Sequence, residues 1–156
     1  MNRHNRPSSA APAAAVPAYE RDFHAWAMVQ AKRIREGAVD TLDRENLAEE
    51  IESLGREQFS KLKSAYRVLL MHILKWDHQP EKRSRSWATT IFTRRLDIMD
   101  VLEDNPSLKG RISEAVAGGY RRARLEAARE TGLPPRVFPE TNPYSLDDIM
   151  DRPFEL

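Results

Sequence analysis

Residues 44–78 read RENLAEEIESLGREQFSKLKSAYRVLLMHILKWDH, and Pro80 follows them closely. Apolar residues recur here at three- and four-residue steps, as on one face of an α-helix: Leu47, Ile51, Leu54, Leu62, Ala65, Leu69, Ile73 and Trp76. Asp43 can cap this helix, and Leu42 and Leu47 stand at the positions of a hydrophobic staple. If it is unbroken, this helix has about 35 residues and is about 52 Å long, and Gly55 is the one place where a bend is expected if it is not straight.

Prolines divide the rest of the chain into segments that can be helical. Because a proline inside a helix costs about 3 kcal/mol, Pro80, Pro106 and Pro134 mark helix ends. A first helix is predicted from about Tyr19 to Glu36, ended by Gly37. Its inward stripe is expected to consist of Phe23, Trp26, Ala27, Ala31 and Ile34.

Two further helices are predicted after the long one. The third begins after Ser84 or Ser86 and directs apolar residues inward: Trp87, Ile91, Ile98, Met99 and Leu102. The fourth is expected to be capped by Ser107 and to end at Gly132. Its inward residues are Leu108, Ile112, Ala115, Val116, Ala123 and Ala127.

A short last helix fits SLDDIM at 145–150, since Ser145 and Asp148 have the spacing of a capping box. Strand-like alternation is nowhere sustained. The sequence therefore predicts an all-α fold, an antiparallel helical bundle of four to five helices around one long central helix. Residues 1–17, rich in Ala, Pro and Ser, are predicted to be a disordered tail, and residues 18–156 a single helical domain.

The composition excludes several classes of protein. The 156 residues include no cysteine, which excludes disulfides and thiolate metal sites, and the net charge of +1 gives no bulk attraction to nucleic acid. No apolar run approaches the ~18–20 residues that cross a bilayer, and prolines interrupt any secretory signal. We expect a cytoplasmic protein with no membrane contact.

Motifs for catalysis or cofactor binding are not found. The sequence has no HExxH, no GxSxG elbow and no glycine-rich phosphate loop. No catalytic, cofactor-binding or metal-ligating residue is therefore assigned, and no cofactor is expected. His72 lies on the apolar stripe of the long helix and is interpreted as a hydrogen-bonded core residue.

The stretch WDHQPEKRSRSW at 76–87 is the candidate ligand or partner surface, with Trp76, His78, Lys82, Arg83, Arg85 and Trp87 as its residues. Its two tryptophans flank a proline turn that carries three cations just before a helix start, a combination that favours anions. The alternative interpretation is that both tryptophans pack in the core and that the arginines pair with acidic segments.

Several segments together are familiar: YERDFHAW at 19–26, ENLAEEIESLG at 45–55, HILKW at 72–76, QPEKRSRSW at 79–87, NPSL at 105–108 and FPETNPYSLDDI at 138–149. They resemble the bacterial family catalogued as domain of unknown function 29. The resemblance implies a small helical protein and brings no activity and no catalytic residue. Asp77 and Arg94 depart from the family pattern, in which glutamine is expected at both positions.

Geometry and charge together predict self-association. A compact domain of about 140 residues is about 37 Å across, so a straight helix of about 52 Å would extend past it and expose apolar residues. Either Gly55 bends the helix or a second chain covers the exposed end, and the charges favour the second chain. Acids at 45–57 precede bases at 61–75, and two copies packed antiparallel about Phe59 would pair them. The acids at 97–104 of the same chain (Asp97, Asp100, Glu103 and Asp104) would serve equally well.

Three function hypotheses follow. The first is a protein-interaction or self-associating module, with a dimer or another protein as partner. The second is an anion or nucleic-acid binding module that uses the turn at 76–87. The third is an enzyme without a recognisable motif.

Overall fold

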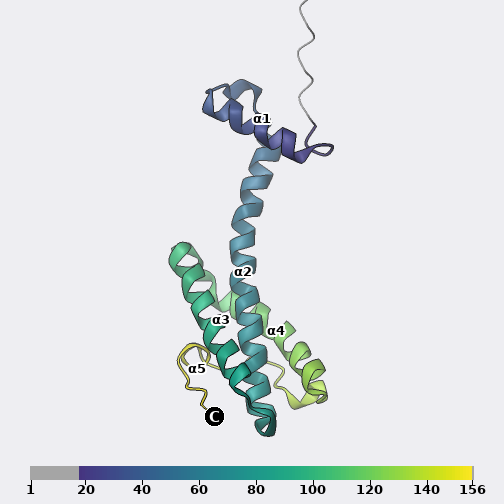
Figure 1. The fold of residues 1–156 in the computed structure, drawn as a ribbon, viewed down its shortest axis with the longest axis vertical. Helices are drawn as coiled ribbons and strands as arrows, with labels where there is room; N and C mark the ends of the chain where they lie inside the picture. Colours follow the sequence, from purple (N-terminus) through teal and green to yellow (C-terminus); the bar gives the residue numbers. More distant parts are fainter. Residues whose placement is uncertain (1–17, 156) are drawn as a thin grey trace, which may run out of the picture. The chain divides into compact units, whose positions relative to one another are not determined.

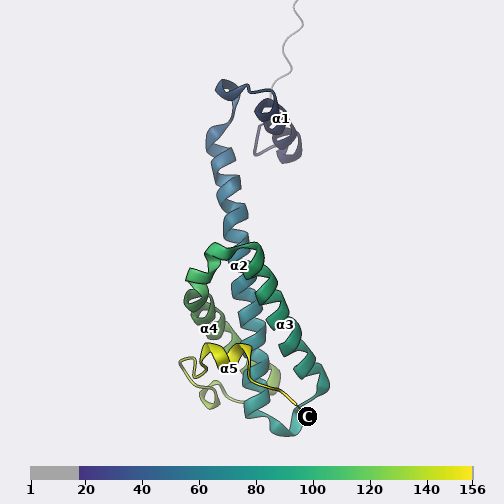
Figure 2. The same cartoon turned by 90° about the vertical axis from the view of Figure 1, so that its left-hand side faces the viewer.

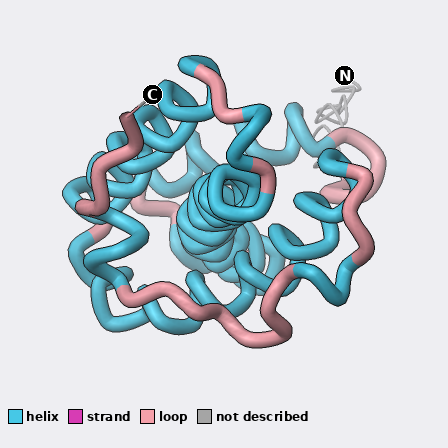
Figure 3. Tube along the Cα trace, turned by 90° about the horizontal axis from the view of Figure 1, so that it is seen from below, coloured by secondary structure: helices cyan, strands magenta, loops and turns pink. Residues whose placement is uncertain are grey.

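The computed structural model describes residues 18–155, and the regular secondary structure of these residues is helical throughout (Figure 3). Its α-helices are α1 (Phe23–Arg35), α2 (Arg44–His78), α3 (Arg85–Asp104), α4 (Ile112–Thr131) and α5 (Leu146–Met150). Short 3₁₀ helices cover Val39–Thr41, Pro80–Lys82, Pro106–Arg111 and Pro135–Val137. The prediction of an all-α antiparallel bundle is confirmed.

Contacts divide the chain into two compact units, one up to Ile51 and one from Glu52 onward. The expected disordered tail at 1–17 lies outside the described residues. The single domain over 18–156 stays a prediction. The two units are described separately below.

α2 has the bounds that the sequence predicts, Arg44–His78. Asp43 caps it, because its Oδ1 accepts a hydrogen bond from the backbone N–H of Asn46 at 3.4 Å. Gly55 does not interrupt the helix. α2 ends before Pro80, because proline has no backbone N–H and cannot continue the helical hydrogen bonds.

In the first unit, polar contacts hold α1 against the start of α2. The indole N–H of Trp26 donates to Asp43 Oδ2 at 3.0 Å, and the backbone N–H of Asp43 donates to Gln30 Oε1 at 2.9 Å. Trp26 and Gln30 are both buried. The side-chain amide of Asn46, which donates to Asp43 Oδ2 at 2.8 Å, and then the indole of Trp26 hold the pKa of the Asp43 carboxyl below its usual value.

The predicted inward stripe of α1 is wrong at both ends. Phe23 is 51% exposed and Ile34 is 54% exposed, while the polar Gln30 takes a buried place between Trp26 and Asp43. α1 also begins later than predicted, at Phe23, because the side chain of Asp22 accepts a bond from the N–H of Ala25 and caps the helix. The expected end is confirmed by the left-handed φ of +70° at Gly37.

In the second unit, α3 and α4 lie on either side of α2 (Figures 1 and 2). α3 runs antiparallel to α2, and α4 runs antiparallel to α3. α5 lies against α3 and α4. The guanidinium of Arg95 on α3 donates to the carbonyl of Ile149 on α5 at 2.8 Å, and residues of α4 and α5 line a common cavity. The core is formed by one face of α2 with residues from the other helices: Leu62, Tyr66, Leu69, Leu70, Ile73, Leu74, Ile91, Ile98, Ala115, Tyr120, Ala123, Ala127, Phe138 and Ile149.

Helix ends in this unit are decided by single residues. Ser84, not Ser86, caps α3, since its side chain accepts the N–H of Trp87. Ser145 and Asp148 form the expected capping box, and Gly132 ends α4 with a φ of +73°. The cap predicted at Ser107 is wrong, because residues 106–111 form a 3₁₀ helix and α4 begins after them.

One predicted core residue of α3 is misplaced. Met99 is 55% exposed, whereas Ile91 and Ile98 are fully buried. The three- and four-residue spacing on this helix fits two faces, and α2 covers only the one that contains Ile91 and Ile98. The second face is described with the candidate site.

Candidate functional site

α2 and α4 cross with their backbones in contact. A Cβ placed on Gly119 would lie 3.0 Å from the backbone N of Arg67 and 3.2 Å from the carbonyl O of Lys63. On the neighbouring Gly118 a Cβ would meet only the Lys63 side chain, at 3.0 Å. A glycine inside a helix costs about 1 kcal/mol relative to alanine, and the close approach of the two backbones is the structural reason for Gly119. Two adjoining grooves, which share Lys63 and Gly118, lie at this crossing.

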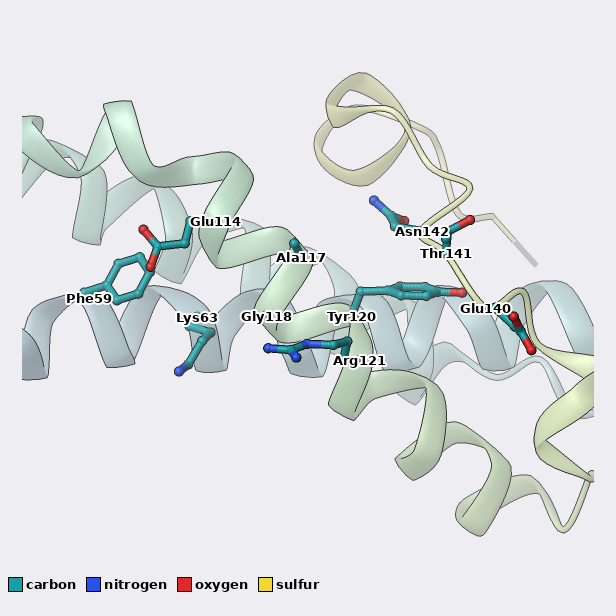
Figure 4. A pocket seen from close by; sticks show the side chains of 10 residues that line it. All are labelled: Phe59, Lys63, Glu114, Ala117, Gly118, Tyr120, Arg121, Glu140, Thr141 and Asn142. Carbon is teal, nitrogen blue, oxygen red and sulfur yellow. The ribbon is translucent and has the colours of Figure 1, made fainter.

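The first groove has a volume of about 520 Å³ and lies between α2, α4 and the segment before α5 (Figure 4). Phe59 and Tyr120 supply aromatic surface, and charged side chains surround it: Lys63, Glu114, Arg121 and Glu140. The hydroxyl of Tyr120 is committed to the carbonyl of Pro139, to which it donates at 2.7 Å. The groove is therefore amphipathic, with a mixed ring of charge.

Of the two carboxylates that line this groove, Glu114 is fixed by the neighbouring Arg111. Arg111 donates two bonds of 2.8 Å to Glu114, and its guanidinium stacks 3.6 Å from the centre of the Phe59 ring. Hydrogen bonding from Arg111 lowers the pKa of Glu114. Glu114 is thus ionised at neutral pH and suited to pairing rather than to general acid catalysis.

The second groove adjoins the first at Lys63 and Gly118 and has a volume of about 380 Å³. Its lining, which we term the basic groove, consists of Ser60, Lys63, Ser64, Arg67, Gly118, Gly119 and Arg122. Arg67 donates to both carboxylate oxygens of Glu126, each at 2.6 Å. Among residues 18–155, no acidic side chain lines the groove itself.

The tryptophan-flanked turn serves the fold more than an open site. Arg83 donates to the carbonyl of Trp76 at 2.9 Å, so it satisfies a free carbonyl at the end of α2, and its guanidinium lies 5.2 Å from the Trp76 ring. Trp76 is buried, and Trp87 packs against the core with the Lys75 Nζ 4.6 Å from its ring. Both tryptophans pack as the alternative interpretation proposes.

The other three residues of this candidate surface lie apart. His78 packs its ring against Phe138 at 4.9 Å between centroids, while Lys82 and Arg85 are exposed. None of the six residues predicted for this surface lines either groove at the α2–α4 crossing. The structure thus joins Arg83 to Trp76 and places Arg85 on a different face, at the first residue of α3.

The basic half of α2 finds its partners on α4. Arg67 pairs with Glu126, and Lys75, which is buried, pairs with Glu130 at 2.6 Å. The sequence-based pairing with acids at 97–104 does not describe these two contacts. Of those acids, Asp97 pairs instead with Arg94 of its own helix at 2.7 Å.

An ion-pair network that sequence reasoning missed joins the C-terminal segment to α2. Asp77 accepts bonds from Arg152 at 2.8 and 3.2 Å and from the hydroxyl of Tyr144 at 2.9 Å. Burial and the Asp77 carboxylate raise the pKa of Tyr144. Asp77 lies in the last turn of α2, where the helix macrodipole disfavours a negative charge, and this position is the signal in the sequence that could have indicated a partner for it.

His72 is half-buried and hydrogen-bonded, so the hydrogen bond interpreted from the sequence is present although the side chain is not part of the buried core. Its Nδ1 lies 2.9 Å from the carbonyl of Val68, and burial lowers its pKa. Residues 18–155 contain no group of three or more side chains arranged to ligate a metal. Among these same residues no helix combines the length and apolar character needed to cross a membrane.

The outer face of α3 carries a row of exposed residues, which we term the α3 outer stripe: Arg85, Thr89, Phe92, Leu96, Met99 and Glu103. Phe92, Leu96 and Met99 are 62, 41 and 55% exposed. Successive members are four, three, four, three and four residues apart, which is the heptad spacing of a helix–helix seam. The sequence analysis missed this second face because the same spacing also produces the buried one.

The family comparison supports the sequence resemblance. The model of the family described as "Domain of unknown function DUF29" matches residues 18–155. Comparison with curated proteins and with solved structures gives no match. Since the family match covers nearly the whole chain, this protein belongs to the DUF29 family.

Proposed function

We propose that this protein is a self-associating interaction module, a two-fold dimer held by antiparallel pairing of the α3 outer stripe. The observation that carries the proposal is the exposure of Phe92, Leu96 and Met99 in a heptad row on a helix whose opposite face forms the core. Large apolar side chains gathered in one exposed row are typical of interaction surfaces.

The spacing of the stripe supports a second copy of the chain as the occupant. The row is symmetric about position 94, so a two-fold axis there sets Phe92 against Leu96 of the partner helix. The same axis sets Thr89 against Met99 and Arg85 against Glu103, each twice per dimer. Every member of the stripe then faces a complementary residue.

The charges on α3 support the antiparallel direction. Its first turn holds no acid and its last turn no base, while Arg85 begins the helix and Glu103 lies in its last turn. This order opposes the helix macrodipole at both ends, at a cost of about 0.3–1 kcal/mol for each charge. An antiparallel partner offsets that cost, because its acidic end lies beside the basic end of the first helix.

The contacts of α2 favour an interface other than the one about Phe59 that the sequence suggests. Antiparallel pairing about Phe59 requires the basic half of α2 to be free, whereas its Arg67 and Lys75 are already paired with α4. Arg111 also covers the Phe59 ring. A single pair of 20-residue helices buries less area than a standard interface, so we expect micromolar affinity.

The other hypotheses receive less support. Nucleic-acid or anion binding by the turn at 76–87 would need Arg83, which already bonds to Trp76. An enzymatic role has no motif and no converging set of acid and base behind it. A cytoplasmic location is proposed from the absence of cysteine, which suits a reducing compartment.

Sedimentation velocity over a micromolar concentration series tests the dimer and its register. Arg85→Glu places two carboxylates together at each end of the interface, and we expect about tenfold weaker association; Glu103→Arg should do the same. Combining Arg85→Glu with Glu103→Arg should restore parental affinity. Arg136→Glu, an equal charge change at an exposed position off the stripe, is the control. A monomer at every concentration contradicts self-association, and a dimer indifferent to both single changes contradicts this register.

A further inference from the structure

We infer that the basic groove binds the phosphate group of a small molecule. It lies in the second unit at the α2–α4 crossing, away from the α3 outer stripe. This inference is independent of the proposed dimer.

Positive charge is concentrated in the groove without a matching acid. Three cationic side chains line it, and of these only Arg67 has a carboxylate partner within the described residues, Glu126. Lys63 and Arg122 form no salt bridge in residues 18–155, although Lys63 lies near enough to Glu114 to help lower the pKa of that carboxyl. Two unpaired cations held beside a third repel one another, and a bound anion removes that cost.

Hydroxyl groups complete the donor set. Ser60 and Ser64 are one helical turn apart on α2, and both line the groove. The guanidinium of Arg67 donates to Ser64 Oγ at 3.4 Å, which leaves the serine proton free to point into the groove. Hydroxyls, an ammonium and planar guanidinium groups are the side chains that hold phosphate oxygens in proteins.

Gly118 fixes the position of Lys63. The Lys63 side chain crosses the bare α-carbon of Gly118, where a Cβ would lie 3.0 Å from Lys63 Cδ and 3.7 Å from Cγ. A Cβ at position 118 would push the Lys63 side chain aside and change where its ammonium lies. Because Gly119 alone accounts for the backbone contact, the placement of Lys63 gives the second glycine a reason of its own.

The neighbouring amphipathic groove indicates the class of ligand. It shares Lys63 and Gly118 with the basic groove and presents the rings of Phe59 and Tyr120 (Figure 4). A phosphate held by Lys63 therefore has aromatic surface beside it. A monoester with an aromatic body fits both grooves, whereas free phosphate fits only the basic one.

Isothermal titration calorimetry with inorganic phosphate and with phenyl phosphate, each at constant ionic strength, tests the inference. We expect both to bind, phenyl phosphate more tightly. Lys63→Gln and Arg122→Gln should each weaken phosphate binding about tenfold, since each removes a charged hydrogen bond. Gly118→Ala should weaken it while the chain stays folded, and Arg129→Gln, an exposed charge elsewhere on α4, should not change it.

The titrations distinguish a phosphate monoester from free phosphate as the ligand, and they also show whether the basic groove binds an anion at all. Tighter binding of phenyl phosphate supports a monoester as ligand, and equal affinities support free phosphate in the basic groove. No heat of binding with either compound overturns the inference. So does equal binding by the parent and by the Lys63→Gln, Arg122→Gln double variant, because the anion then lies elsewhere. Circular dichroism of every variant shows that its helices are intact.

Discussion

Gly119→Val is expected to destabilise the second unit by about 3 kcal/mol, at the upper end of the cost of overpacking a core. The β-carbon alone would lie 3.0 Å from the backbone N of Arg67 and 3.2 Å from the carbonyl of Lys63. Backbone atoms cannot rotate away as a side chain can, so α2 and α4 must separate. The added methyl groups are also confined to few rotamers within a helix. Urea unfolding followed by circular dichroism measures the change.

Gly118→Ala is the matched control for that experiment. Its new methyl group meets only the flexible Lys63 side chain, and alanine gains about 1 kcal/mol of helix propensity over glycine. We expect its stability to equal or exceed that of the parent. Equal stability of the Gly119→Val variant and the parent would contradict the close helix crossing on which both grooves depend.

Leu96→Glu is expected to abolish the dimer at micromolar concentration. Leu96 lies next to the centre of the proposed interface, and two-fold symmetry buries two copies of the new carboxylate against Phe92 of each partner. Burying an unpaired carboxylate is costly, so we expect association at least about a hundredfold weaker. The folded chain should tolerate the change, since Leu96 is 41% exposed and glutamate is a good helix former.

Leu125→Glu provides the comparison for that variant. Leu125 is 58% exposed on α4, outside the α3 outer stripe, so the same chemical change there should leave the dimer intact. Sedimentation velocity measures both variants. If the two weaken association equally, or neither does, the outer face of α3 is not the interface.

Local signals were sufficient to predict most of the fold. The bounds of α2 follow from Asp43 and Pro80, the capping box from Ser145 and Asp148, and the end of α4 from Gly132. Each depends on residues within one turn of the helix end. Because these interactions are local in the sequence, the helix ends can be predicted without knowing which helices pack together.

The faces of the helices could not be predicted in the same way. On α3 one heptad row is buried and another, with Phe92 and Leu96, is exposed, and only the position of α2 decides between them. On α1 the buried place of Gln30 depends on a bond to the backbone of Asp43, which is distant in the sequence. The types of these residues alone do not indicate which face of α1 or α3 is buried.

The candidate site could not be predicted from the sequence either, because it also depends on which helix faces pack together. The turn at 76–87 has the composition of an anion site, yet Arg83 is needed to satisfy a carbonyl at the end of α2. The basic groove combines serines and a lysine of α2 with an arginine some 60 residues later. Long-range pairs such as Arg67 with Glu126 form only once the helices have packed.

Disulfide cross-linking of the dimer tests the central claim most directly, because the chain has no cysteine of its own. In the antiparallel register Thr89 faces Met99 of the partner, whereas the two copies of Thr89 lie about 15 Å apart, beyond the ~7 Å Cα separation that a disulfide spans. A mixture of Thr89→Cys and Met99→Cys chains should therefore form a covalent dimer under mild oxidation, and neither variant should do so alone. Cross-linking of each variant with itself, or none in the mixture, would contradict the antiparallel α3 interface.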